Sequence, residues 1–244
     1  MMAYELITIL GPTASGKTKF AAALADKLDT EIISADSRQV YRGMDIGTGK
    51  DLEDYTVGGR HIPYHLIDIC NAGEKYSIFR FQQDFHRVFR QIKNTPVMCG
   101  GSGLYIESVI RGYTFNGEQK NYPPVNSLII GIDIERNLRR EKISRRLHQR
   151  LDAGMLDETK RLLNSGIKAE TLISYGLEYK YQTLHLTGKL NYDQMIKQLE
   201  TAIHQFAKRQ MTWFRGMEKR GLTVHWINSE TTISQKTEAV LNKI

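Results

Sequence analysis

The chain has 244 residues, of which 41% are hydrophobic and 25% are charged, and its formal net charge is +7. This length predicts one α/β domain with a full core, or one domain with a small appendage, and the positive charge suits an anionic partner. Two cysteines without a C-x-x-C spacing and seven histidines without a metal spacing argue against a disulfide framework or a zinc site. Free thiols, with no signal peptide or long apolar run, predict a cytoplasmic protein without a membrane partner.

The N-terminal segment predicts a phosphate-binding loop between a strand and a helix. Residues 5–10 form an apolar strand pattern, and a helical pattern runs to about Leu28. Between them stands the motif G-x-x-x-x-G-K-[ST], as Gly11-Pro12-Thr13-Ala14-Ser15-Gly16-Lys17-Thr18. Backbone N–H groups and the helix dipole would cradle an anion, Lys17 would reach the outer phosphate oxygens, and the Thr18 hydroxyl would hold Mg²⁺. The motif predicts a polyphosphate ligand without specifying which one.

Short strands and helices then alternate along the chain. Further strands are predicted at residues 31–34, 65–69, 96–99 and 128–132, with helices over 79–92 and from Leu104. This alternation predicts a parallel sheet covered by helices on both faces, of the P-loop NTPase-like α/β class.

The C-terminal half reads as helical from residue 135. A last long helix is predicted over 192–219, and residues 224–227 fit a closing strand. Gly112 to Val125 is polar and contains glycine and proline, which predicts a loop. We therefore expect residues 1–244 to form a single P-loop α/β domain whose region 135–220 is mainly helical and basic.

Three loops are expected to share one rim, because ligands of open parallel sheets bind beyond the carboxyl ends of the strands. They are the phosphate loop, residues 35–41, and the glycine cluster 100–103. In the second loop, Asp36 is suited to hold Mg²⁺ or to accept a proton, and the alternative is a turn or helix-capping aspartate. In the third, Ser102 would hydrogen-bond a substrate beside Asp36 or cap the next helix. Asp68, at a strand end, and the run 44–50 carry weaker signals.

Positive charge is concentrated in two predicted helices. The clusters are Arg136, Arg139, Arg140, Lys142, Arg145, Arg146 and Arg150, and then Lys208, Arg209, Arg215, Lys219 and Arg220. Such clusters favour phosphate or nucleic-acid contact, the alternative being a solvated surface. On these residues alone, a kinase, an NTPase and other transferases all remain open.

Four blocks of the sequence resemble the tRNA dimethylallyltransferase family, also called isopentenylpyrophosphate transferases. They are residues 11–18, residues 34–41 continuing through 44–50, residues 100–105, and residues 207–215. The phosphate loop alone is a weak match, whereas the block Ser34-Ala35-Asp36-Ser37-Arg38-Gln39-Val40-Tyr41 is close to diagnostic. The four blocks occur in the family's order and span most of the chain.

The resemblance implies transfer of a dimethylallyl group from dimethylallyl diphosphate to the N6 of an adenine next to the tRNA anticodon. The phosphate loop would hold the donor's diphosphate, with Mg²⁺ on Thr18, and Asp36 would accept the N6 proton. Ser102 stands where the family usually has threonine, and retains the hydroxyl. The remaining implied contacts are Arg140 and Arg146 on the diphosphate, Ser37, Arg38 and Gln39 on the adenine, and Lys208, Arg209 and Arg215 on the tRNA anticodon loop. We expect a monomer and a core position for Trp213.

Two departures from the family pattern concern the acceptor. The short loop Gly112 to Val125 replaces a helical insertion that embraces the anticodon stem-loop in full-length members. The segment Tyr175-Gly176-Leu177-Glu178 replaces a Gly-Tyr-x-Glu-like segment, and we expect both changes to affect tRNA recognition rather than the diphosphate site. The alternatives are a prenyltransferase acting on free adenine nucleotides, a P-loop small-molecule kinase, and a non-catalytic nucleotide- or RNA-binding relic.

Overall fold

A six-stranded sheet forms the centre of the molecule, in a computed structural model that describes residues 4–115 and 122–244. The strand order is β5-β2-β6-β1-β7-β8, and every neighbouring pair is parallel. The strands are β1 Leu6–Leu10, β2 Ile32–Ser34, β5 Tyr64–His65, β6 Val97–Gly100, β7 Ser127–Asp133 and β8 Val224–Asn228. The predicted P-loop NTPase-like α/β class is confirmed, including the closing strand β8.

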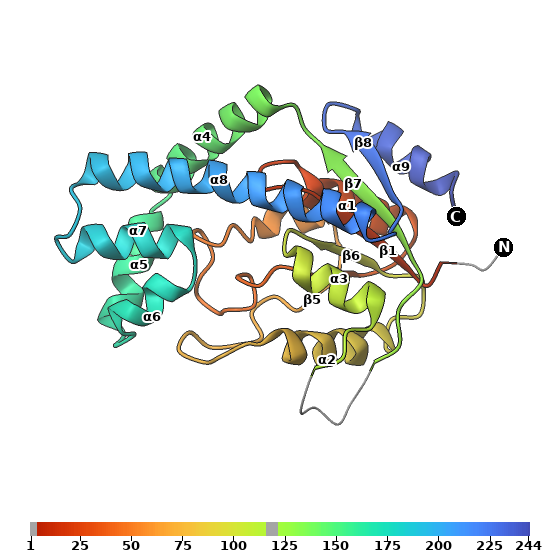
Figure 1. The fold of residues 1–244 in the computed structure, drawn as a ribbon, viewed down its shortest axis with the longest axis horizontal. Helices are drawn as coiled ribbons and strands as arrows, with labels where there is room; N and C mark the ends of the chain where they lie inside the picture. The colour runs from red at the N-terminus through yellow and green to blue at the C-terminus, as the bar shows by residue number, and fades with distance from the viewer. Residues whose placement is uncertain (1–3, 116–121) are drawn as a thin grey trace.

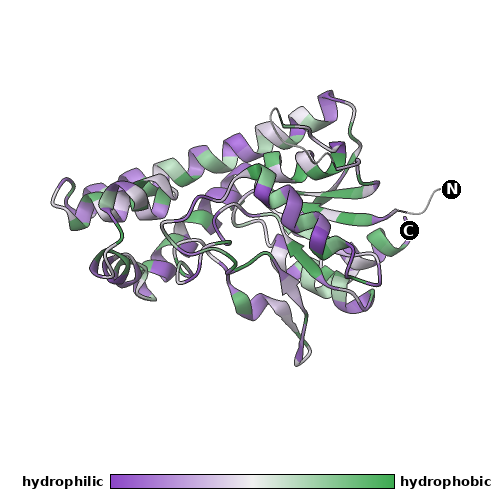
Figure 2. Ribbon diagram, turned by 90° about the horizontal axis from the view of Figure 1, so that it is seen from below, coloured by the Kyte–Doolittle hydropathy of each residue, from purple (hydrophilic) through white to green (hydrophobic). Residues whose placement is uncertain are grey.

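Helices cover both faces of this sheet (Figure 1). On one face lie α1 (Lys17–Lys27) and α9 (Ile233–Leu241). On the other lie α2 (Ile78–Phe89), α3 (Gly103–Arg111) and the C-terminal part of α8 (Tyr192–Lys219). Strand β1 shows why the sequences of the central strands are continuous apolar runs. Leu6 and Leu10 pack on the second face, while Ile7 and Ile9 pack on the first, so both sides of the strand are buried. Figure 2 shows these central strands as mainly hydrophobic ribbon.

The remaining helices form a second group, which we call the helical lobe. It contains α4 (Arg136–Asp152), α5 (Met155–Asn164), α6 (Ala169–Ser174), α7 (Leu177–Leu186) and the N-terminal part of α8. The 28-residue α8 begins at a capping box made by Asn191 and Gln194, and it runs from the lobe across the sheet (Figure 1). It therefore fixes the lobe against the α/β core. Within the described residues, no helix is long and apolar enough to cross a membrane.

The structure differs from the sequence prediction after β5. The predicted strand 65–69 ends at His65, because Leu66 and Asp68 adopt left-handed backbone conformations with φ of 63° and 56°. A 3₁₀ helix, η1 (Leu52–Tyr55), and the hairpin of β3 (Thr56–Val57) with β4 (Arg60–His61) were not predicted.

The expected loop from Gly112 to Val125 falls partly outside the described residues. Residues 113–115 and 122–125 contain no helix or strand, in agreement with the prediction, and residues 116–121 are not described. Both described ends of the loop pack on α2. The Phe115 ring lies 6.4 Å from that of Phe79, and Tyr122 stacks on His86 with ring centroids 4.4 Å apart.

Candidate active site

The phosphate loop lies between β1 and α1, as its sequence motif requires. Gly16 precedes the helix with a φ of 78°, and Ala14 also has a left-handed backbone, at 61°. These two conformations turn the chain sharply at the helix start. Among the described residues, the N–H groups of Gly16, Lys17 and Thr18 find no acceptor. A helix N-terminus with unpaired N–H groups and a positive dipole end is an anion-binding site.

The Lys17 side chain is held within this loop. Its Nζ lies 3.4 Å from the Pro12 carbonyl oxygen. Burial lowers the pKa of Lys17, and the Asp36 carboxylate opposes that shift, so the two charges are near neighbours. An anion in the loop would stabilise the charged form of Lys17 in the same way.

The loop's hydroxyl groups fit a magnesium ion held together with phosphate oxygens. Within the described part of the chain, the Thr18 hydroxyl makes no hydrogen bond, and the buried Ser15 Oγ has no partner either. No group of three or more Asp, Glu, His or Cys side chains in residues 4–115 and 122–244 is arranged to hold a metal by itself. Mg²⁺ commonly uses one or two protein oxygens, completed by phosphate and water. The residues therefore fit an ion shared between Thr18 and a bound diphosphate.

Asp36 and Ser102 come together on neighbouring loops at the carboxyl ends of β2 and β6. The Ser102 Oγ accepts a hydrogen bond of 2.9 Å from the N–H of Ser37, and the Ser102 N–H donates to the Ala35 carbonyl at 3.2 Å. A side chain at Gly100 would collide with that same carbonyl, so this close approach needs glycine. Ser102 does not cap α3 with its side chain. Its hydroxyl instead ties the α3 loop to the Asp36 loop.

The Asp36 carboxylate has one engaged oxygen and one available oxygen. Its Oδ1 accepts from the N–H of Arg38 at 2.9 Å, which is the turn-forming contact expected under the alternative interpretation. Its Oδ2 makes no hydrogen bond within the described residues. The turn therefore orients the carboxylate and leaves Oδ2 able to accept a proton.

Gln210 of α8 bridges two of the three loops. Its Oε1 accepts from the Thr13 N–H at 2.9 Å, and its Nε2 donates to the Gly101 carbonyl at 3.0 Å. The residue lies in the block 207–215, but sequence reasoning assigned it no role. Its contact partners are distant in the chain, and only the fold brings them together.

Arg146 of α4 lies near the phosphate loop and shares the Asp51 carboxylate with Arg150. Arg146 and Arg150 both ion-pair with Asp51, Arg150 at 3.3 Å, and the Arg146 charge lowers the pKa of Lys17. The sequence analysis placed Arg150 in the basic cluster but did not assign it to the diphosphate, although its i+4 spacing from Arg146 places both on one face of a helix. The Arg150 guanidinium also packs on Gly49, where any side chain would collide with it.

Arg140 does not belong to this group. It is exposed on α4, and its charge acts on His204 of α8 rather than on Lys17. The structure therefore gives no support to Arg140 as a diphosphate ligand, because it lies about one and two-thirds helical turns from Arg146, on a different side of α4.

Glu178 lies on the same side of the molecule as the arginines. Burial raises its pKa, Arg150 and Arg146 oppose that shift, and Asp36 adds to it. Glu178 is therefore close to the charges of Arg150, Arg146 and Asp36. The expectation that this departure concerns tRNA recognition stays a prediction.

The loop 44–50 is anchored from two sides. The buried Glu158 of α5 accepts hydrogen bonds from the N–H groups of Asp45, Ile46 and Gly47, at 2.8, 2.8 and 2.9 Å. Lys50 is 1% exposed and binds the Asp45 and Asp68 carboxylates. The buried Lys50 and the partly exposed Asp68 therefore form an ion pair with each other, so neither is free to serve as an anion or metal ligand at the phosphate loop.

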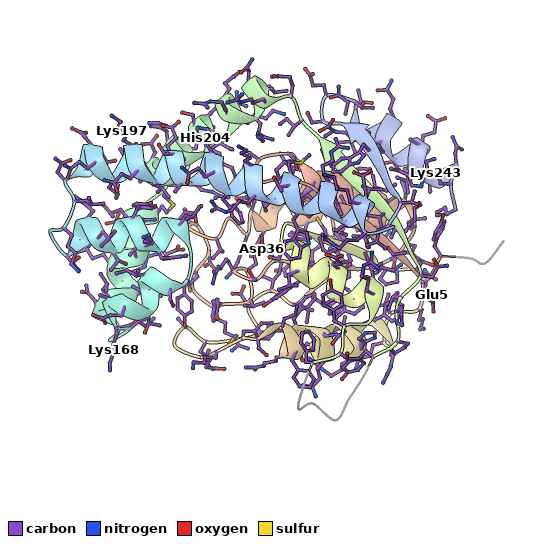
Figure 3. The ribbon with its side chains drawn as sticks, viewed as in Figure 1. Glu5, Asp36, Lys168, Lys197, His204 and Lys243 are labelled. Atoms are coloured by element: carbon purple, nitrogen blue, oxygen red, sulfur yellow. The ribbon has the colours of Figure 1, made fainter. Side chains whose placement is uncertain are left out.

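The predicted adenine contacts have partners of their own. Gln39 accepts from the Ser34 hydroxyl at 3.1 Å and donates to the Gly49 carbonyl at 3.1 Å, so most of its amide is engaged. Ser37 is joined to Ser102, and Arg38 packs against Gly176. The structure brings these residues next to Asp36, at the centre of the molecule (Figure 3).

The basic residues of α8 divide into two kinds. Lys208 and Arg209 are exposed and form no ion pair within the described residues. Arg215 is engaged with Asp133, Glu218 and the face of Trp226, whose ring centroid lies 4.0 Å away. Trp213 is 39% exposed, so the prediction of a core tryptophan is wrong.

Taken together, the loops define a P-loop protein with an anion cradle, a pair of arginines, and a carboxylate with a free oxygen beside a hydroxyl. The sequence matches the family described as IPP transferase over residues 39–122 and 114–217. A tRNA dimethylallyltransferase 2 of Bacteroides fragilis is 51% identical over 300 aligned positions, which cover 99% of this chain and 98% of the relative. The chain therefore belongs to the IPP transferase family.

Solved structures agree with this assignment. A tRNA isopentenylpyrophosphate transferase from Bacillus halodurans superposes with a TM-score of 0.87 at 28% identity, covering 99% of this chain and 95% of that one. The Staphylococcus epidermidis protein gives a TM-score of 0.85 at 26% identity, covering 98% of both chains.

This chain is shorter than its relatives internally. The 300 aligned positions of the Bacteroides fragilis relative exceed the 244 residues of this chain by 56, yet both chains are covered almost completely. The family match also breaks into two segments that meet at residues 114–122. Both findings agree with a short loop in place of the family's insertion.

Proposed function

We propose that this protein transfers a dimethylallyl group from dimethylallyl diphosphate to the N6 of an adenine in tRNA. The observation that carries the proposal is the Asp36 carboxylate, which has a free oxygen beside the phosphate loop and is near the charge of Lys17. Family membership supports the reaction class, and the Bacteroides fragilis relative is named a tRNA dimethylallyltransferase.

The donor's diphosphate would lie on the phosphate loop, bound by its N–H groups, Lys17, Arg146 and Arg150. When N6 attacks the allylic carbon, a nitrogen–carbon bond forms, and the bond from that carbon to the diphosphate oxygen breaks. The diphosphate leaves with the electron pair, and Asp36 Oδ2 takes the N6 proton. Mg²⁺ at the Thr18 hydroxyl would supply further neutralisation of the leaving group's negative charge. Ser102 positions the Asp36 loop through Ser37.

The acceptor is the part of the proposal that needs a direct test. Lys208 and Arg209 are exposed cations without an ion pair in the described residues, and they suit an RNA backbone. The short loop at 112–125 favours the second candidate, a free adenine nucleotide, because a small acceptor needs no stem-loop clamp.

The test uses isotopically labelled dimethylallyl diphosphate, offered in parallel with unmodified tRNA and with AMP, ADP and ATP. We expect label in the tRNA. Label that appears only in a free nucleotide would replace the tRNA assignment with the nucleotide one. Transfer of the γ-phosphate of ATP without any prenyl transfer would indicate a kinase instead.

A further inference from the structure

Helix α8 presents exposed aromatic side chains on its solvent side. Phe206 and Trp213 are each 39% exposed and lie seven residues apart, so two helical turns place them on one side of α8. Arg209 lies between them, with its guanidinium 6.0 Å from the centre of the Phe206 ring. Leu104, 42% exposed, is near the same end because it follows Gly103 of α3.

The Trp213 ring is held in a defined place beside the candidate active site. A side chain at Gly103 would collide with its Cδ1, so the indole lies directly on the first residue of α3. The preceding residue, Ser102, binds the loop that carries Asp36. The guanidinium of Arg220 lies 5.5 Å from the indole centroid and is fixed by two hydrogen bonds, of 2.7 and 2.6 Å, to the buried Glu107. The Trp213 N–H has no partner within the described residues.

We propose that Trp213, extended by Phe206 and Arg209, is a stacking surface for an unpaired base of the acceptor RNA next to the target adenine. This inference rests on the proposed function. An adenine that enters a pocket must leave its base stack, which exposes the faces of its neighbours. Aromatic side chains with adjacent cations bind such bases without sequence preference. Lys208 and Arg209 add the positive charge that a phosphate backbone needs, which an apolar protein partner would not require.

The chain offers a direct spectroscopic test, because it contains two tryptophans. The second, Trp226, is partly buried, donates its indole N–H to Glu218 at 3.0 Å, and is covered by Arg215. The variant Trp226→Phe leaves Trp213 as the sole indole. We expect saturable quenching of its fluorescence by an anticodon stem-loop RNA, and none by a fully paired RNA of equal length. Equal quenching by both RNAs, or by neither, would contradict base stacking.

Kinetics give an independent test. Trp213→Ala should raise the KM for tRNA at least about fivefold, in line with loss of one stacked base, while the KM for dimethylallyl diphosphate stays unchanged. Trp213→Phe should restore most of the tRNA affinity. Tyr192→Ala is the matched control, because Tyr192 is a 45% exposed aromatic residue at the opposite end of α8.

The two proposals fail in different ways. If wild-type protein prenylates tRNA and Trp213→Ala keeps its KM for tRNA, the stacking assignment is wrong and the proposed function stands. If wild-type protein prenylates only free nucleotides, the proposed tRNA function is wrong. A Trp226→Phe protein that binds an unrelated protein segment, but no RNA, would also overturn the stacking assignment.

Discussion

Gln210 accepts a hydrogen bond of 2.9 Å from the backbone N–H of Thr13, a residue 197 positions away in the chain. The same amide donates to the Gly101 carbonyl, so one side chain of α8 fixes the phosphate loop relative to the loop of Ser102. Because α8 also packs within the helical lobe, the lobe that carries Arg146 and Arg150 is tied to the same frame. Helix α8 therefore positions the loops of the site, as the sheet does.

Replacing Gln210 with leucine should weaken donor binding and lower stability. The substitution preserves volume but leaves the Thr13 N–H and the Gly101 carbonyl without partners, and each buried unpaired group costs about 1–3 kcal/mol. We expect a lower midpoint in urea unfolding and a higher KM for dimethylallyl diphosphate. Gln205→Leu, on an exposed position of the same helix, is the control. An unchanged donor KM in Gln210→Leu would show that the loop keeps its shape without the bridge.

Asp36→Ala should abolish turnover and spare donor binding. Loss of a general base typically costs about 10²–10⁴-fold in rate, whereas the diphosphate contacts of the phosphate loop remain. Single-turnover transfer and equilibrium binding of dimethylallyl diphosphate separate the two effects. Lys17→Ala provides the opposite pattern, with donor affinity lost first. Near-normal turnover of Asp36→Ala would eliminate the general-base assignment.

Arg150→Ala should raise the KM for dimethylallyl diphosphate by about tenfold, since hydrogen bonds to charged groups contribute about 1.5–3 kcal/mol. Arg140→Ala should leave it within about twofold, because Arg140 is exposed and acts on His204 instead. Both variants remove one arginine from α4, so the comparison controls for net charge. Equal effects of the two would mean that α4 acts through its overall charge and not through a defined contact.

The parts of the fold that the sequence predicts are those with a local signal. The phosphate loop has its strand and helix as neighbours, and α8 was predicted with its observed bounds. The extent of β5 was missed because left-handed residues at Leu66 and Asp68 end it. Aspartate adopts that conformation more often than most residues, but leucine rarely does, so the apolar run gave no sign of its end at Leu66.

The sequence predicts those site residues that lie within one recognisable loop, such as Lys17 and Asp36. It does not predict contacts between residues that are distant in the chain. The position of Arg150 beside Arg146 could have been predicted from helical spacing, whereas the hydrogen bonds of Gln210 could be found only from the tertiary fold. Trp213 is a second residue whose position helical spacing could have predicted. The buried stripe of α8 passes through Ala207, Gln210, Phe214 and Met217, and Trp213 lies beside that stripe rather than on it. Helical spacing thus assigns it to the edge of the core.

His86 of α2 is expected to make the protein less stable in mild acid. The side chain is 4% exposed, stacks on Tyr122 and contacts Phe85 and Phe89, and its Nε2 has no hydrogen-bond partner within the described residues. Burial, with a smaller effect from the nearby Arg90, lowers its pKa from the ordinary 6.5 to about 4. Between these two values the unfolded chain binds a proton that the folded protein does not, so stability falls as the pH falls from 6.5 toward 4.

This linkage predicts that His86 accounts for a loss of about 2 kcal/mol in the free energy of unfolding between pH 7 and pH 5. His86→Phe and His86→Gln, which cannot be protonated there, should both reduce the difference in unfolding free energy between those pH values by about that amount. Urea unfolding at each pH measures it, and His148→Gln, at an exposed position on α4, is the control. If the His86 variants keep the wild-type pH dependence, the acid sensitivity belongs to other groups, and the Tyr122 stack accommodates a charged imidazole.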